Sequence, residues 1–266
     1  MAHDYKRRSA LAALHEQGRV IYALILREVR TRFGRHKLGY LWALIEPTLH
    51  IGVFWTLFYL GGRQTVGSMS VPLFIATGLM SFFTFQQTYF RLNGSIRSNF
   101  ALLAHRQVKP LDVVIARALL EGATTLCVLV LFIVAAIYFG EDLRLRDPLK
   151  AIAALILLWV MGIGLGLLLE SLSAALQSLR LLVNVLTRFL YFTSGIFFTL
   201  SMLGGQTQKF LLYNPLLHLV ETVRYSFDST LVVPDVNLVY PLMWAISILF
   251  LGLASDRALR DSTLSR

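Results

Sequence analysis

A glutamate and a histidine lie one helical turn apart in an apolar stretch near the N-terminus. Glu46 and His50 are four residues apart, so a helix would present both on one face. Carboxyl and imidazole groups are common proton-transfer groups, so one hypothesis is an intramembrane transferase that uses the two as acid and base. An ionisable residue in such a stretch normally faces protein or water. Pro47, next to Glu46, should kink the helix because it lacks an amide N–H.

A second polar set, His218, Glu221 and Arg224, recurs every third position and would lie on roughly one helix face. His218 and Glu221 could ligate a metal, but no third ligand accompanies them, so a structural ion pair between Glu221 and Arg224 is favoured. Another ion pair is expected between Arg117 and Glu121. These two residues lie one turn apart in a different apolar stretch, where pairing lowers the cost of burying both charges.

The sequence has no motif for a familiar nucleotide-binding or hydrolytic site. It contains no Gly-x-x-x-x-Gly-Lys-[Ser/Thr] loop, no Gly-x-Ser-x-Gly elbow and no His-Glu-x-x-His helix. Its single cysteine, Cys127, lies in an apolar run and is expected to be a small buried hydrophobe. Few charges lie inside the apolar stretches, whereas ion-driven carriers need them near the middle of the bilayer. The protein should therefore draw its energy from a partner.

Composition indicates an integral membrane protein. Of 266 residues, 56% are hydrophobic and 15% are charged, and the mean hydropathy is +0.64. A soluble domain has about 25% charged residues. The net charge of +10 comes from basic residues that flank apolar runs, so it indicates cytoplasmic loops and not a nucleic-acid surface.

The apolar runs predict an all-α membrane domain over residues 41–254, because a helical span needs about 20 residues. A basic stretch, from Arg27 to Lys37, leads directly into the first run. Gly162, Gly164 and Gly166 in the fourth run should allow close helix contact. The six expected spans are 41–60, 71–90, 111–139, 149–169, 179–198 and 238–254.

Three further segments are too short or too polar to span. Residues 1–40 should form a cytoplasmic tail, loosely ordered over 1–18, with an amphipathic interface helix over 19–33. A short basic helix is expected at about 93–104, with Asn93 or Ser95 as its cap and an apolar edge open to a partner. Residues 199–237 should form re-entrant or surface helices broken at Asn214-Pro215.

The distribution of basic residues predicts the orientation. Seventeen of the 25 lysines and arginines fall in segments expected inside and six fall in segments expected outside, while Arg117 and Arg188 are embedded. The positive-inside rule therefore places both termini, including a short tail over 255–266, in the cytoplasm.

Three segments resemble the permeases of type-2 ATP-binding-cassette exporters, and among them the capsular polysaccharide export permeases. They are RTRFGRHKLGYLWALIEPTLH at 30–50, RQVKPLDVVIARALLE at 106–121 and YNPLLHLVETVR at 213–224. The resemblance covers about residues 23–254. It implies a homodimer of six-span subunits in the bacterial inner membrane, with two separate ATPase subunits that bind ATP and magnesium, while this chain binds no cofactor or metal.

The resemblance also implies roles for particular residues. The ATPase subunits would contact the N-terminal helix and the first cytoplasmic loop, which contribute Arg27, Arg30, Asn93, Ser95, Arg97 and Phe100. The first and fifth spans would line the channel with Trp55, Phe58, Tyr59, Arg180, Asn184, Arg188, Tyr191 and Phe192. Residues 199–237 would form the outer gate, and a periplasmic co-polymerase and an outer-membrane channel would continue the route.

Simple chemistry agrees with a lipid-linked, anionic polysaccharide as cargo. Aromatic faces bind sugar rings loosely, and arginines attract carboxylates or phosphates without demanding one register. The alternatives are O-antigen or teichoic-acid export, lipid or drug export through a pocket that Arg180 and Arg188 do not face, the transferase, and a membrane scaffold.

Overall fold

The computed structural model describes residues 2–33, 39–62, 64–103, 107–141, 143, 145–172, 178–228, 230 and 235–264. This part of the chain is nearly all helical, as the sequence predicts, apart from a small antiparallel hairpin that pairs Thr65 with Ser70. The elements are α1 (Ala2–Phe33), α2 (Gly39–Leu60), β1 (Thr65–Val66), β2 (Met69–Ser70), α3 (Val71–Leu92), α4 (Ser95–Ser98), α5 (Phe100–Leu103), α6 (Pro110–Tyr138), α7 (Pro148–Leu172), α8 (Ser178–Thr193), η1 (Leu200–Met202), α9 (Gly205–Leu211), α10 (Pro215–Tyr225) and α11 (Val239–Leu264).

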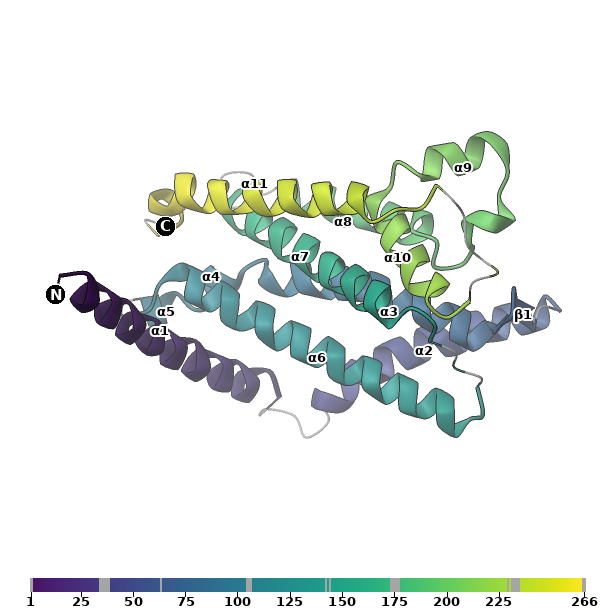
Figure 1. Cartoon of the computed structure of the whole chain (residues 1–266), viewed down its shortest axis with the longest axis horizontal. Helices are drawn as coiled ribbons and strands as arrows, with labels where there is room; N and C mark the ends of the chain where they lie inside the picture. The colour runs from purple at the N-terminus through teal and green to yellow at the C-terminus, as the bar shows by residue number, and fades with distance from the viewer. Residues whose placement is uncertain are drawn as a thin grey trace.

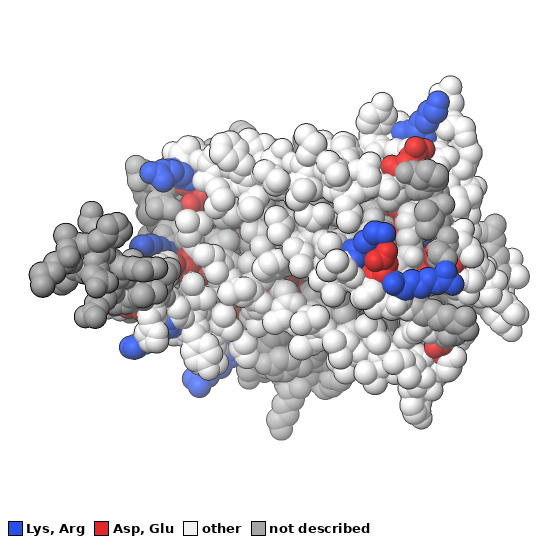
Figure 2. All heavy atoms as spheres, in the orientation of Figure 1, with Lys and Arg blue, Asp and Glu red and all other residues white. Residues whose placement is uncertain are grey.

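The long helices run along the molecule between two ends (Figure 1). The α4 end carries α4, α5 and both chain termini, and the α9 end carries α9 and the hairpin. On the face shown in Figure 2, lysine, arginine, aspartate and glutamate gather at the two ends, with a broad band of other residues between them. This distribution suits a protein whose middle lies in a bilayer.

Within the described residues, three helices are long and apolar enough to cross a membrane: α6, α7 and α11 over Val239–Leu259. Shorter apolar stretches occupy Leu44–Leu60 of α2 and Leu181–Thr193 of α8. The expected first, second, third, fourth and sixth spans coincide with α2, α3, α6, α7 and α11, although α11 continues through most of the expected tail.

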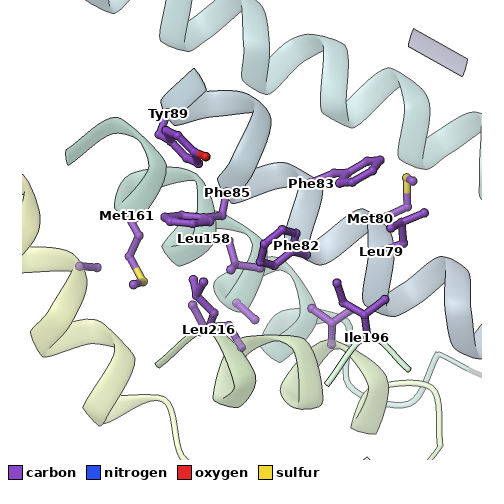
Figure 3. Close-up of a cluster of buried hydrophobic side chains, with 14 of the residues drawn as sticks. Leu79, Met80, Phe82, Phe83, Phe85, Tyr89, Leu158, Met161, Ile196 and Leu216 are labelled. Carbon is purple, nitrogen blue, oxygen red and sulfur yellow. The ribbon is translucent and has the colours of Figure 1, made fainter. Parts of the chain in front are cut away.

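The helix α3 lies at the centre and packs against α2, α6, α7 and α10. Phe82 and Phe85 of α3 meet Leu158 and Met161 of α7, with Leu216 of α10 beside them (Figure 3). The helix also carries buried hydroxyls that donate to carbonyls one turn earlier, namely Thr77, Ser81, Thr84 and Thr88. Because these hydroxyls are satisfied within the helix, α3 can be buried without being uniformly apolar.

Three glycines of α7 bring neighbouring backbones close, as the sequence predicts. A Cβ on Gly162 would lie 2.8 Å from the carbonyl oxygen of Phe85 on α3, and one on Gly164 would lie 2.6 Å from the amide nitrogen of Leu249 on α11. Gly252 of α11 faces the Gly164 carbonyl in the same way, at 2.6 Å. Side chains at these positions would force the three helices apart.

Four sequence predictions need correction. The N-terminal helix begins at Ala2 and not near residue 19, so residues 2–18 are helical. The single helix expected over 93–104 is two short turns, α4 and α5, separated at Asn99. The fifth span ends at Thr193, five residues early, because residues 194–199 form a largely buried turn. Cys127 is exposed on α6 and is not buried.

Candidate functional site

Residues 94–103, which we call the α4–α5 segment, begin with a sharp turn at the end of α3. Gly94 has a φ of 87°, a left-handed conformation that glycine adopts without strain. A carboxylate from another helix caps the turn. Glu170, near the end of α7, accepts hydrogen bonds from the amides of Gly94, Ile96 (3.0 Å) and Arg97 (3.3 Å).

The helix α1 lies along the first half of α6, joined to it by two ion pairs. Arg32 pairs with Glu121 at 2.7 Å, and Glu28 pairs with Arg117 at 2.8 Å. The expected pair between Arg117 and Glu121 is therefore wrong, because each residue takes its partner from α1. Tyr22 and Leu26 of α1 are exposed, and the face toward α6 carries Glu28 and Arg32.

Hydrogen bonds extend these contacts to the α4–α5 segment. Arg27 of α1 donates to the side-chain oxygen of the buried Asn99. Arg117 donates to the Ser98 hydroxyl at 2.9 Å and to the Arg91 carbonyl at 3.1 Å. The segment is thus held by α1, α6 and α7 at once.

The residues expected to contact an ATPase separate into two groups. Arg30, Arg97 and Phe100 are exposed, and Phe100 is 51% exposed. Asn93 and Ser95 face inward, and within the described residues neither Asn93 Oδ1 nor Ser95 Oγ has a hydrogen-bond partner. Neither of them caps α4, since Glu170 does so. Arg27 is exposed and bonded to Asn99, so it anchors the segment from α1.

The expected channel residues on α2 do not all face the same way. Trp55 and Tyr59 are 50% and 61% exposed. Phe58 packs instead against the apolar cluster that includes Val66 and Met69 of the hairpin. Of the three expected channel residues on α2, Trp55 and Tyr59 are therefore the ones exposed in this single chain.

On α8, the expected channel residues form an exposed face. Asn184, Arg188 and Phe192 are exposed, whereas the Tyr191 ring packs 5.4 Å from that of Phe82. The Arg180 side chain lies outside the described residues. Aromatic stacking joins α2 to the turn after α8, where the rings of Phe54 and Phe197 are 4.1 Å apart. The two helices that carry the expected channel residues are thus connected at the α9 end.

A fully buried arginine organises the turn after α8. Arg224 of α10 donates to the carbonyls of Phe198 (3.2 Å), Ile196 (3.3 Å) and Phe74 (3.4 Å). Its guanidinium carbon also lies 3.8 Å from the centre of the Phe74 ring, within the range of a cation–π contact. Arg224 therefore ties α10, α3 and the turn together.

Glu221 completes this group, which we call the Arg224 cluster. Its carboxylate lies 3.4 Å from Arg224 and accepts hydrogen bonds from Thr199 Oγ1 (3.0 Å) and the Leu200 amide (3.1 Å). Burial raises the pKa of Glu221, and the neighbouring Arg224 opposes that rise. Gly78 of α3 leaves room for the guanidinium, because a Cβ there would lie 2.6 Å from Arg224 Nη2.

His218, the third member of the expected set, faces away from Glu221. Its Nε2 bonds to the Leu212 carbonyl at 2.9 Å, and its Nδ1 accepts from the Asn237 amide at 3.3 Å. Burial lowers the pKa of His218, and the bond to Leu212 partly offsets this. The described residues contain no cluster of three or more His, Cys, Asp or Glu that could hold a metal.

Glu46 and His50 do not form a carboxylate–imidazole pair through hydrogen bonding. His50 Nδ1 bonds to the backbone carbonyl of Glu46 at 2.9 Å, and the His50 ring meets the Phe83 ring edge-on at 5.5 Å. This geometry gives the transferase hypothesis no acid–base couple.

Sequence reasoning missed Glu28, Asn99 and Glu170. Glu28 and Glu170 act on residues more than 70 positions away, so no local pattern exposes them. Asn99 interrupts the expected helix. One sign of this is present in the sequence, because a polar amide side chain occurs there among the apolar residues Ile96 and Phe100.

Comparison with known proteins gives a consistent result. Residues 19–227 match the family described as ABC-2 type transporter. The chain is 35% identical to the polysialic acid transport protein KpsM of Escherichia coli, over 92% of this chain and 95% of that protein. It is 32% identical to the capsule polysaccharide export inner-membrane protein CtrC of Neisseria meningitidis serogroup A (92% and 93% covered) and 30% identical to BexB of Haemophilus influenzae, which has the same description (89% of each covered).

Proposed function

This chain belongs to the ABC-2 type transporter family, as a permease related to capsule polysaccharide export inner-membrane proteins, and we propose that it moves a lipid-linked, anionic capsular polysaccharide out of the cytoplasm. We propose that two copies form the path and that two separate ATPase subunits, which hold the ATP and magnesium, supply the energy. A periplasmic co-polymerase and an outer-membrane channel would receive the cargo.

The observation that carries the proposal is the α4–α5 segment. It presents Arg97 and Phe100 at the molecular surface while α1, α6 and α7 hold it from behind. An exposed aromatic next to an exposed arginine is a common composition for a protein-binding hot spot. A surface that is both exposed and firmly anchored can receive a force and pass it inward.

The proposed topology has six spans and places the α4 end in the cytoplasm. The six are α2, α3, α6, α7, α8 and α11, and both termini lie at the α4 end (Figure 1). The band of other residues between the charged ends, on the face shown in Figure 2, supports a middle that lies in the membrane. The α9 end, with its short helices α9 and α10, would then face the periplasm as the outer gate.

The exposed face of α8 supports an anionic cargo. It combines Asn184 and Arg188 with the aromatic Phe192, and α2 carries the exposed Trp55 and Tyr59. The KpsM relative is named for polysialic acid, a polymer of an acidic sugar. Replacing Arg188 with alanine should lower the polysaccharide reaching the cell surface several-fold, while lysine, which keeps the charge, should retain most export. Equal export by both variants would contradict an electrostatic role for this residue.

Co-purification of the ATPase tests the docking surface. Phe100→Asp should weaken ATPase capture because it removes an exposed aromatic side chain and adds a charge to the interface. The matched control is Phe210→Asp on α9, where the phenylalanine is 65% exposed at the opposite end. The proposal expects capture to fall at least tenfold for the first variant only. Unchanged capture by Phe100→Asp would refute the assignment.

A further inference from the structure

Glu170 belongs to α7, yet its carboxylate serves the α4–α5 segment. The side chain is only 7% exposed, and it accepts the amides of Gly94, Ile96 and Arg97 from across 73 to 76 positions of sequence. Backbone amides bonded to a carboxylate form charge-assisted hydrogen bonds, which are roughly twice as strong as neutral ones.

The turn α4 depends on this external cap. A four-residue helix is too short to be stable alone, and its first amides have no partner within the helix. Gly94, at the N-cap position, has no side chain, and within the described residues Ser95 Oγ bonds to nothing. Glu170 is therefore the side chain that satisfies the start of α4.

The position of Glu170 does not favour α7 itself. A carboxylate near the C-terminus of a helix is repelled by the helix dipole, by about 0.3–1 kcal/mol at an exposed site. α7 has no basic residue in its last turn to compensate. The bonds to the amides of the α4 turn stabilise a buried carboxylate at this position.

The rest of α7 is locked to its neighbours. Gly162 and Gly166 approach α3 so closely that a Cβ would lie 2.8 Å and 2.6 Å from its atoms, and Gly164 approaches α11 at 2.6 Å. Close-packed backbones of this kind transmit displacement because they cannot deform gradually. A displacement that reaches α7 must therefore involve α3 and α11 as well.

We propose that Glu170 is a positioning residue through which movement of the α4–α5 segment reaches α7 and the helices packed against it. The inference builds on the proposed function, since it takes the movement to come from an ATPase docked on Arg97 and Phe100. The covalent links through α3 and α6 would not suffice, because Gly94 on one side and residues 107–109 on the other lie in non-helical backbone. Glu170 bypasses both by bonding backbone amides of the segment, whereas Arg117 of α6 and Arg27 of α1 bond the side chains of Ser98 and Asn99.

Two measurements on the Glu170→Gln variant test this inference. Glutamine keeps the shape but loses the charge. In the purified permease without ATPase, hydrogen exchange of the 94–97 amides should become at least about tenfold faster, since one lost bond to a charged group has that effect. In the complex with its ATPase subunits, surface polysaccharide per ATP hydrolysed should fall at least about threefold, with ATPase capture and KM for ATP unchanged.

The matched control is Glu28→Gln, which removes a carboxylate that joins α1 to α6 but does not touch α4. It should leave exchange of the 94–97 amides close to that of the wild type. A purely structural role for Glu170 would lower complex yield and export together and keep the ratio of cargo to ATP constant, which would overturn the inference. Unchanged exchange, or loss of ATPase capture, would also overturn it. The exchange measurement needs no ATPase, so it remains decisive if docking at Phe100 is refuted.

Discussion

Replacing Arg224 with methionine is the sharpest test of the Arg224 cluster. Methionine approximates the length of the arginine stem but donates no hydrogen bond. The substitution removes the Arg224 bonds to the Ile196 and Phe198 carbonyls, and to the Phe74 carbonyl, which keeps its bond from the Thr77 hydroxyl. It also leaves the Glu221 carboxylate buried without its cation. Both side chains of the pair are fully buried, so solvent cannot compensate.

The expected destabilisation is large. Breaking one partner of a buried ion pair costs about 3–5 kcal/mol. For a domain of this size, each kcal/mol lowers the melting temperature by about 2–4 °C, so a fall of roughly 10 °C is expected. The double variant Glu221→Gln with Arg224→Met should recover a substantial part of the loss, because it removes the unpaired charge.

The deficit of Arg224→Met should depend on pH. Burial already raises the pKa of Glu221, and loss of Arg224 removes the charge that opposes the rise. A carboxyl with a folded-state pKa above its unfolded value binds protons preferentially in the folded state. The deficit should therefore be greatest at neutral pH and shrink as pH falls through the folded pKa.

These effects are measured by heating the protein in detergent at pH 7.5 and pH 5 and using size-exclusion chromatography to quantify the folded fraction at each temperature. The control is Lys209→Met, which removes an exposed cation from the neighbouring α9 and should change the melting temperature by less than about 2 °C. If Arg224→Met melts within that same margin of the wild type, the cluster does not hold the turn, and the reasoning from burial is refuted.

Two further outcomes follow from the geometry. Gly164→Ala places a Cβ 2.6 Å from the backbone of α11 and should destabilise the protein by about 1–3 kcal/mol. The control Gly52→Ala has open space around it and should be neutral or stabilising by up to about 1 kcal/mol. Equal melting temperatures for the two variants would contradict the close-packing argument. Because the folded pKa of His218 is depressed, its contribution to stability is complete above its unfolded pKa of about 6.5 and is lost as pH falls through the folded value. His218→Gln should flatten this acid dependence of the melting temperature, and an unchanged slope would assign it to another group.

The sequence predicts most of the helices because membrane spans depend on the length of an apolar run. α6 and α7 begin and end within three residues of their expected bounds. The fifth span was predicted too long because residues 194–198 are apolar enough to continue a helix. The backbone instead turns at Gly195, which has a φ of 77°. Arg224 stabilises this turn by donating a hydrogen bond to the Ile196 carbonyl.

The candidate site was predicted less well, because its side chains choose partners across the fold. Arg117 and Glu121 have the spacing of an ion pair within one helix. However, α1 packs against α6 and places an opposite charge within 2.8 Å of each of them. The cap from Glu170 could not be predicted, since it depends on the end of α7 meeting the end of α3. By contrast, Glu221 and Arg224 form their expected contact because both lie on one helix and no competing charge is bonded to either in the described structure.

The exposed thiol on α6 makes the chain convenient for spectroscopy. Cys127 is its only cysteine, and the residue is exposed on the folded subunit. A nitroxide or fluorophore attached there would mark each subunit once, with no need to remove background thiols first. In an assembly of two copies, the separation of the two labels would report directly on how the subunits move during the transport cycle.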